Sequence, residues 1–284
     1  MAERGRRKTG TAVRSGIVAG IVAGVCVCAA GCSGDGAAAP GGRDDRAADP
    51  VRTLHRAADA LVAAGTSKAR TSMEMATGGT LVTIRGQGVY DYRRQLGQLK
   101  VLLPQDPAGT SEHRPITELL APGALFMKNR GAGVPDDKWV RVETATLSDG
   151  NLVTGGATDP FAAAEVLRGT RTATYVGRTE VAGTAVRHYR GTADLTVAAE
   201  NASAGGRDAL RAAAKGFATA RVPFDVYLDD EGRIRKVRHR FSFVNGQQRE
   251  AVAVASTTLL YDFGAPVQVR LPAADDIYAG RIAE

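Results

Sequence analysis

Few residues of this chain have the types and spacing that chemistry requires. Its four histidines are too far apart for an HxH or HExxH metal site: they are His55, His113, His188 and His239. The sequence also has no G-x-S-x-G elbow, S-x-x-K pair or P-loop, so we expect no enzyme, no metal and no cofactor. The clearest reactive group is the thiol of Cys32, which follows three small residues.

Cys32 ends a segment that is organised like a secretion signal. Basic residues at 4–14 precede the uncharged run 16–30, which is too short to span about 30 Å of hydrocarbon and is typical of a signal-peptide core. Residues 29–32, AAGC, resemble the bacterial lipobox, whose Cys is acylated and becomes the first residue of the mature chain; Ala29 replaces the usual Leu. We therefore expect a lipoprotein signal peptide at 1–31 and a lipid anchor at Cys32. An uncleaved signal anchor is the alternative.

Charge and cysteine usage agree with export to the outer side of the cell membrane. Residues 1–31 have five basic residues and one acidic residue, which is +4 of the formal net charge of +7, so nucleic acid is not an expected partner. The other two cysteines, Cys26 and Cys28, lie in the signal core, so the mature domain has no thiol for a disulfide or a metal. Residues 32–49 lack bulky apolar side chains and are predicted to form a disordered tether.

The patterns from residue 50 to residue 284 predict one α+β domain. Asp49-Pro50 and Asp159-Pro160 each combine a helix N-cap with a first-turn proline. Apolar and polar residues alternate over most of the remaining chain, which predicts a single antiparallel sheet of roughly ten strands with three helical pieces. The expected strands lie in 68–103, 125–128, 138–143, 173–195 and 222–263, and the expected helices in 50–64, 161–168 and 197–220.

Four stretches of this domain resemble the actinobacterial LppX/LprG-type lipoproteins. They are KWVRV at 138–142, the hairpin 175–195, VPFDVYLDDEGRI at 222–234 and LYDFGAPV at 260–267. The resemblance implies a LolA-like half-barrel, in which a strongly curved antiparallel sheet has helices over its concave face. It also implies an apolar cavity for acyl chains between sheet and helices, a lipid or glycolipid ligand, and a protein partner from the export machinery.

The composition leaves open whether this interior is a cavity or a closed core. The chain has only 7 Phe, 7 Tyr and 1 Trp, with abundant Ala and Gly on the covered faces, so the interior could hold an apolar ligand or pack closely. The candidate cavity residues are Met73, Met75, Val82, Ile84, Tyr90, Leu99, Val101, Phe161, Leu167, Leu210, Phe217, Phe224, Val226, Phe241 and Phe243. We expect a lipid-binding carrier. The alternatives are an envelope interaction or sensor protein with a filled core and, last, a hydrolase with dispersed catalytic residues.

One cluster of basic residues stands out at 233–240, with Lys236, Arg238 and Arg240 on one face of a predicted strand. Such a cluster is typical of a solvated outer face. Its functional alternative is contact with anionic lipid head groups.

Overall fold

The computed structural model describes residues 49–77, 80–104, 114–131, 133–244 and 251–280. The predicted signal peptide, the tether and Cys32 lie outside these residues, so they stay predictions. Within the described residues, no helix is long and apolar enough to cross a membrane.

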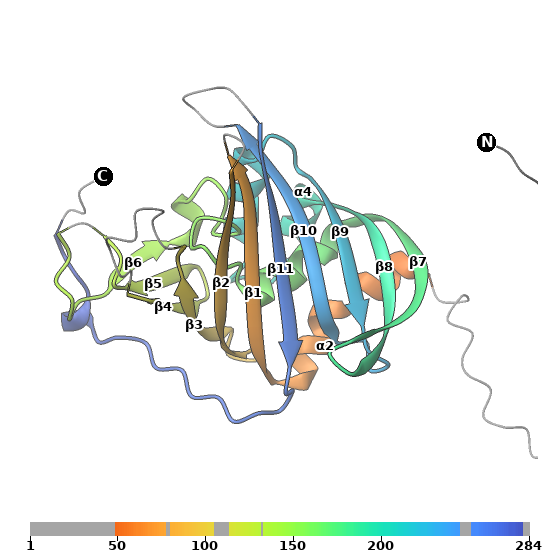
Figure 1. Ribbon diagram of the computed structural model, residues 1–284, viewed down its shortest axis with the longest axis horizontal. Helices are drawn as coiled ribbons and strands as arrows, with labels where there is room; N and C mark the ends of the chain where they lie inside the picture. The colour runs from red at the N-terminus through yellow and green to blue at the C-terminus, as the bar shows by residue number, and fades with distance from the viewer. Residues whose placement is uncertain (1–48, 78–79, 105–113, 132, 245–250, 281–284) are drawn as a thin grey trace, which may run out of the picture. The chain divides into compact units, whose positions relative to one another are not determined.

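The domain is built on one antiparallel sheet of eleven strands, in the order β6-β5-β4-β3-β2-β1-β11-β10-β9-β8-β7 (Figure 1). The strands are β1 (Thr66–Thr77), β2 (Thr80–Asp91), β3 (Leu96–Leu102), β4 (Ile116–Ala121), β5 (Ala124–Lys128), β6 (Val140–Glu143), β7 (Thr170–Val181), β8 (Thr184–Asp194), β9 (Arg221–Leu228), β10 (Ile234–Val244) and β11 (Ala251–Tyr261). The sheet is curved and does not close into a barrel. This confirms the predicted α+β class and half-barrel architecture.

The sequence patterns missed one strand, β4. Its residues ITELLA do not alternate, because Leu119 and Leu120 are both buried on opposite faces of the sheet. Leu120 points to the main core, whereas Leu119 packs with Phe126 and Val269 in a second, smaller cluster under the C-terminal segment. A strand that is covered on both faces loses the period-two signal from which strands are predicted.

Short helices lie against the concave face of the sheet (Figure 1). They are α1 (Pro50–His55), α2 (Ala57–Ala64), α3 (Pro160–Val166), α4 (Leu195–Asn201) and α5 (Arg207–Gly216), with 3₁₀ turns at Thr144–Thr146, Leu167–Gly169 and Ala274–Asp276. Helix α1 contacts β7, α2 contacts β1 and β10, α3 contacts β10 and β11, and α4 contacts β8. None of the five helices exceeds ten residues, so the cover consists of separate small pieces.

Carboxylate caps begin three of these helices. Asp49 Oδ1 accepts the backbone N–H of Val51 at 3.0 Å, and Asp159 Oδ1 accepts that of Phe161 at 2.7 Å, which confirms both predicted caps. The predicted boundaries near 195 and 220 were wrong. Asp194 caps α4, so Leu195 starts a helix instead of ending a strand. The later helix ends at Gly216, where the chain turns back toward β9.

The register of the strands fixes which residues face the helices. Met73 of β1 lies opposite Ile84 of β2 and Ser256 of β11, and the same parity runs through the neighbouring strands. The inward-facing side chains and the helices form one large hydrophobic cluster, and both clusters lie within residues 54–277. Residues 49–284 therefore contain every described part of the core, in agreement with the compact unit expected of a domain, and the experiments below use this segment.

Candidate functional site

The predicted cavity residues come together on the concave face and in its helical cover. Twelve of them are buried in the main cluster: Met73, Ile84, Tyr90, Leu99, Val101, Phe161, Leu167, Leu210, Phe217, Phe224, Val226 and Phe241. Met75 and Val82 are half-buried against this cluster, and the side chain of Phe243 lies outside the described part of the structure. These residues form a continuous apolar surface, and their role as a ligand lining stays a prediction.

Aromatic rings join the helices to this face. Phe161 of α3 lies 6.4 Å from the ring of Tyr90 on β2. Phe217, directly after α5, stacks on Phe241 of β10 with ring centroids 5.0 Å apart. Ring pairs at such distances stabilise the packing beyond the area that they bury. The helical cover is therefore fixed to the sheet at two places, near β2 and near β10.

The middle of the concave face is covered by a loop, residues 147–159, which we call the strap. A methyl group placed on Gly156 would lie 3.3 Å from side-chain carbons of both Ile84 and Val101. Thr158 Oγ1 and Ser256 Oγ of β11 are 2.5 Å apart and share a buried hydrogen bond. The strap thus lies directly on Ile84 of β2 and Val101 of β3, which the sequence predicts to line a cavity, and on Ser256 of β11, which it does not.

The strap holds its shape through one buried carboxylate. Asp149 accepts backbone hydrogen bonds from Asn151, Val153 and Thr154 at 3.1, 2.8 and 2.6 Å. Thr154 Oγ1 donates a further hydrogen bond to Asp149 at 2.9 Å. The loop is folded by its own side chain. It is held in place by the buried side chain of Leu152, by the Thr158 hydroxyl and by Arg130, which donates to the carbonyls of Thr154 and Gly155 at 3.3 and 3.4 Å.

Little space remains under this cover. A small cavity lies between the strap, α3, α5 and the β4–β5 turn. Its volume is about 40 Å³, and its lining includes Tyr90, Asp159, Phe161 and Glu165. One water needs about 10–15 Å³ by this measure, so the cavity has room for about three waters and not for an acyl chain. Among the described residues, this space beside the strap is therefore too small for an acyl chain.

Glu118 of β4 is the most unusual group on the concave face. Its side chain is fully buried between Leu99 and Met127 on the neighbouring strands, and neither carboxyl oxygen has a hydrogen-bond partner among the described residues. A methyl group on Gly155 of the strap would lie 3.0 Å from its Oε1. Burial raises the pKa of Glu118 to about 8, against a smaller lowering by Arg130. The carboxyl is therefore protonated at neutral pH and can donate a hydrogen bond.

Two other titratable groups lie at the strap: Asp159, its half-buried last residue, and the buried His239. Burial raises the pKa of Asp159 to about 6, although hydrogen bonds from Ala162, Phe161 and Tyr90 lower it in part. Burial lowers the pKa of His239 to about 3, so its ring is neutral. His239 lies opposite Ser256, but the hydroxyl of Ser256 bonds to Thr158 instead, and Nε2 of His239 has no hydrogen-bond partner in the described part of the chain.

Four of the buried polar side chains without a partner lie on the concave face, spread over β4, β1, β11 and β10. Besides Glu118 and His239, the hydroxyls of Thr71 and Thr258 are buried without a hydrogen-bond partner among the described residues, and these two threonines are direct neighbours across β1 and β11. All four side chains point inward. A buried polar group without a partner costs about 1–3 kcal/mol, so four on one face indicate a surface suited to polar groups that the chain itself does not supply.

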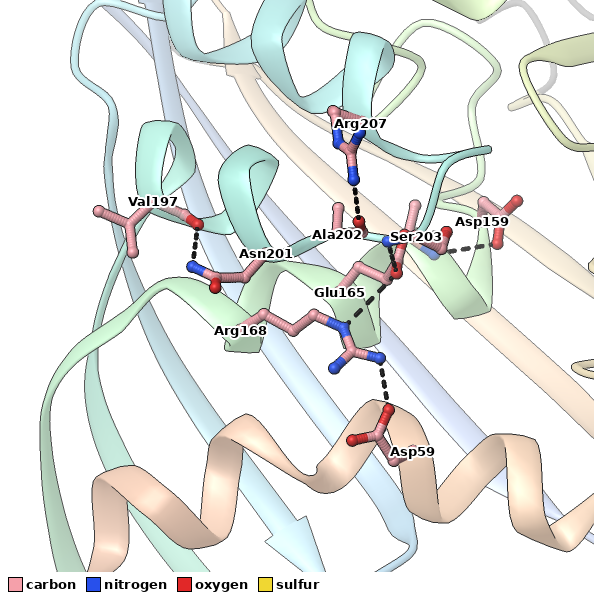
Figure 2. Close-up of polar contacts among 10 residues, drawn as sticks. Asp59, Asp159, Glu165, Arg168, Val197, Asn201, Ala202, Ser203 and Arg207 are labelled. Carbon is pink, nitrogen blue, oxygen red and sulfur yellow. Dashed lines mark hydrogen bonds and ion pairs between the residues drawn. The ribbon is translucent and has the colours of Figure 1, made fainter.

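A polar network holds the helices of the cover to each other (Figure 2). Glu165 of α3 is almost fully buried and accepts hydrogen bonds from the backbone N–H and the hydroxyl of Ser203, at 2.8 and 3.0 Å. Arg168 pairs with Glu165 at 3.5 Å and with Asp59 of α2 at 2.7 Å. Through these contacts α2, α3 and the α4–α5 connection are linked, and Asp159, the last residue of the strap, is drawn beside them as the N-cap of α3.

Sequence reasoning missed Glu118 and the strap. Glu118 lies in the unpredicted strand β4, and a single Glu between apolar residues is usually an exposed one. The only signals for the strap were the consecutive glycines Gly155 and Gly156 and the small residues beside them. Such residues also occur in ordinary surface loops, so only the structure shows that this loop lies inside.

Comparisons with known proteins found similarity at the level of structure. No protein-family model matches the sequence, and the comparison with curated proteins found no match. Among solved structures, the chain is similar to LprF from Mycobacterium bovis, with 16% identity over 79% of this chain and 97% of that chain, at a TM-score of 0.42. It is also similar to the Mycobacterium tuberculosis lipoprotein LppX, with 10% identity, 78% and 100% coverage and a TM-score of 0.45.

A LolA superfamily protein from Nitrosomonas europaea is a third similar structure, with 10% identity, 76% and 95% coverage and a TM-score of 0.34. The type of lipoprotein that the sequence motifs resemble is therefore among the similar folds. At these identities and TM-scores, the function has to be argued from this chain's own residues.

Proposed function

We propose that this protein is a lipoprotein of the cell envelope that binds a lipid or glycolipid between its curved sheet and the helical cover. The observation that supports this most is the strap. A continuous apolar face is covered at its centre by a loop and not by a helix. The loop places Gly155 and Gly156 against the sheet and buries Leu152 in the core. Removal of that loop would expose the side chains of Ile84 and Val101 and the carboxyl of Glu118.

On this proposal, the strap occupies the place of the ligand in the unliganded protein. An acyl chain that replaces residues 155–158 would keep the apolar face covered, so the hydrophobic stabilisation of about 25 cal/mol per Å² would be retained. The orphaned polar atoms of Glu118, Thr71 and Thr258 could then bond to an ester, hydroxyl or sugar group. Their position agrees with a ligand that has both apolar and polar parts.

The membrane anchor is the second part of the proposal and rests on the sequence. Acylation of Cys32 would hold the mature protein at the outer side of the cell membrane, with the tether 32–49 between the lipid and the domain. Partners from the export machinery would meet the domain there. Identification of the bound lipid would define the cargo and would indicate the direction of its transfer.

One observation favours the alternative, an envelope interaction or sensor protein with a permanently filled core. The described interior cavity of about 40 Å³ is too small for any lipid in this conformation. If the strap never leaves the sheet, the outer surface would perform the function. The two possibilities therefore differ in a single physical property, which is the mobility of residues 147–159.

The experiment is to purify the full-length protein from a bacterial envelope, record its mass under native conditions and extract it with organic solvent. We expect one lipid molecule per chain, and its identity would define the cargo. A bare protein mass, together with no uptake of added phospholipid or glycolipid, would contradict the carrier role and support the filled-core alternative.

A further inference from the structure

The outer, convex face of the sheet has three neighbouring cations on β1, β2 and β3. Arg70 lies opposite Gln87, Gln87 lies opposite Lys100, and Arg85 is two residues away from Gln87 on the same strand. Diagonal neighbours on one face of a sheet are about 7–8 Å apart, so these three exposed side chains surround Gln87. We call Arg70, Arg85 and Lys100 the basic triad.

Among the described residues, no carboxylate pairs with the basic triad. Arg70 lies over the ring of Tyr261, 5.1 Å from its centroid, and neither Arg85 nor Lys100 has a hydrogen bond or ion pair in the described part of the chain. The three cations therefore concentrate positive charge on one part of the convex face, where an external anion could pair with them.

The basic cluster that the sequence singled out is different. Arg233 pairs with Asp229 at 2.8 Å, Arg238 with Glu74 at 2.9 Å, and Arg240 with Asp225 at 3.1 Å. These ion pairs neutralise most of the 233–240 cluster, in agreement with a solvated outer face. The basic triad lies on β1, β2 and β3, on the other side of β11 from this cluster, and sequence patterns did not single it out.

The basic triad borders two adjoining hollows in the convex face. The first has a volume of about 300 Å³ and is lined by all three cations together with Leu102 and Leu259. The second has a volume of about 360 Å³, shares Gln87 and Lys100 with the first, and reaches Tyr261. Leu102 is 51% exposed, which is unusual for a large apolar side chain. This surface thus combines an apolar floor with a cationic rim.

We propose that the basic triad and its hollows form a docking surface for an anionic phospholipid bilayer. Guanidinium and ammonium groups would bond to the phosphate oxygens, and the exposed leucine would reach the boundary of the acyl chains. A soluble polyanion would satisfy the cations but leave Leu102 in water, so the bilayer surface fits the chemistry better. Docking through the convex face also leaves the concave face and the strap free, so this inference goes beyond the proposed cargo and does not depend on it.

The test is cosedimentation of residues 49–284, which lack the predicted anchor, with phosphatidylcholine vesicles that either contain or lack phosphatidylglycerol. The test variant is Arg70→Gln/Arg85→Gln/Lys100→Gln. The matched control, Arg171→Gln/Lys215→Gln/Arg221→Gln, removes the same number of exposed charges from other surfaces. Thermal unfolding of both variants checks that they fold. If the test variant unfolds, two other variants replace it. They are the charge-preserving double variant Arg70→Lys/Arg85→Lys and the single variant Lys100→Gln.

We expect binding only to the vesicles with phosphatidylglycerol, and weaker binding at high salt. The triad variant should bind on the order of 100-fold more weakly, because each basic residue near such a surface contributes about fivefold. The control should bind like the wild type, and Leu102→Ser should weaken binding several-fold without any change of charge.

Three results would overturn the docking surface. They are no binding of the wild type, equal losses in the triad variant and in the control, and unchanged binding of Leu102→Ser together with tight binding of a soluble polyanion such as heparin. Absence of a copurified lipid would contradict the proposed cargo but would leave this result untouched.

Discussion

Glu118→Gln should stabilise the domain at neutral pH, although it alters a fully buried residue. In the folded protein the pKa of Glu118 is about 8, and in the unfolded chain it returns to the ordinary value of 4.5. Between these two pH values the folded state holds a proton that the unfolded state has lost, so the stability of the wild type falls as the pH rises. At about 1.36 kcal/mol per pH unit, the loss from pH 4.5 to pH 7 is about 3 kcal/mol.

Glutamine has nearly the same shape and does not titrate, so it removes this loss. Urea unfolding of residues 49–284 at pH 5 and at pH 7 measures the difference. The two proteins should be almost equally stable at pH 5, and Glu118→Gln should be more stable by about 3 kcal/mol at pH 7. Glu180→Gln, which alters an exposed residue of β7, is the control and should change neither value. Equal pH dependence of wild type and Glu118→Gln would show that Glu118 finds a partner in solution and would refute this reasoning.

Two further substitutions test the interior. His239→Phe should remove a loss of stability that the wild type shows at acid pH. The pKa of His239 is about 3 in the folded protein and 6.5 in the unfolded chain, so the wild type loses about 2 kcal/mol of stability between pH 6.5 and pH 5. The variant should not show this loss, and urea unfolding at both pH values measures the difference. Gly156→Ala should destabilise the domain by about 1–2 kcal/mol more than Gly183→Ala, because both glycines have positive φ but only Gly156 presses on Ile84 and Val101. Equal thermal shifts for the two glycine variants would contradict the close contact between strap and sheet.

The sequence predicted most of the sheet because most strands are covered on one face only. In β1, Met73 and Thr71 face the core while Arg70 and Ser72 face water, and this alternation is visible in the amino acids themselves. The helix starts at Asp49 and Asp159 were predictable for a similar reason, since a cap is a local interaction between a carboxylate and the next few N–H groups. Strand β4 could not be found in this way, because its two faces are both buried.

The candidate site was predictable only in its apolar part. Residues such as Ile84, Leu99 and Phe224 could be assigned to the covered face from periodicity. The position of the strap depends on contacts between residues far apart in the chain, for example Thr158 with Ser256, and no local pattern encodes them. The same holds for the basic triad, which three different strands bring together.

The most direct test of the central claim is to lock the strap to the sheet. The hydroxyls of Thr158 and Ser256 are 2.5 Å apart, so Thr158→Cys/Ser256→Cys places two sulfurs near the disulfide distance of about 2.0 Å. Residues 49–284 contain no other cysteine. The matched control is Thr172→Cys/Thr192→Cys, whose hydroxyls are 2.7 Å apart on β7 and β8, away from the strap.

Both pairs would be offered phospholipid in the oxidised and in the reduced form, and bound lipid would be counted by native mass spectrometry. We predict that the oxidised strap lock takes up no lipid, that reduction restores uptake, and that the control binds lipid in both forms. Equal uptake by the oxidised and reduced strap lock would show that lipid does not enter beneath residues 147–159, and would contradict the account.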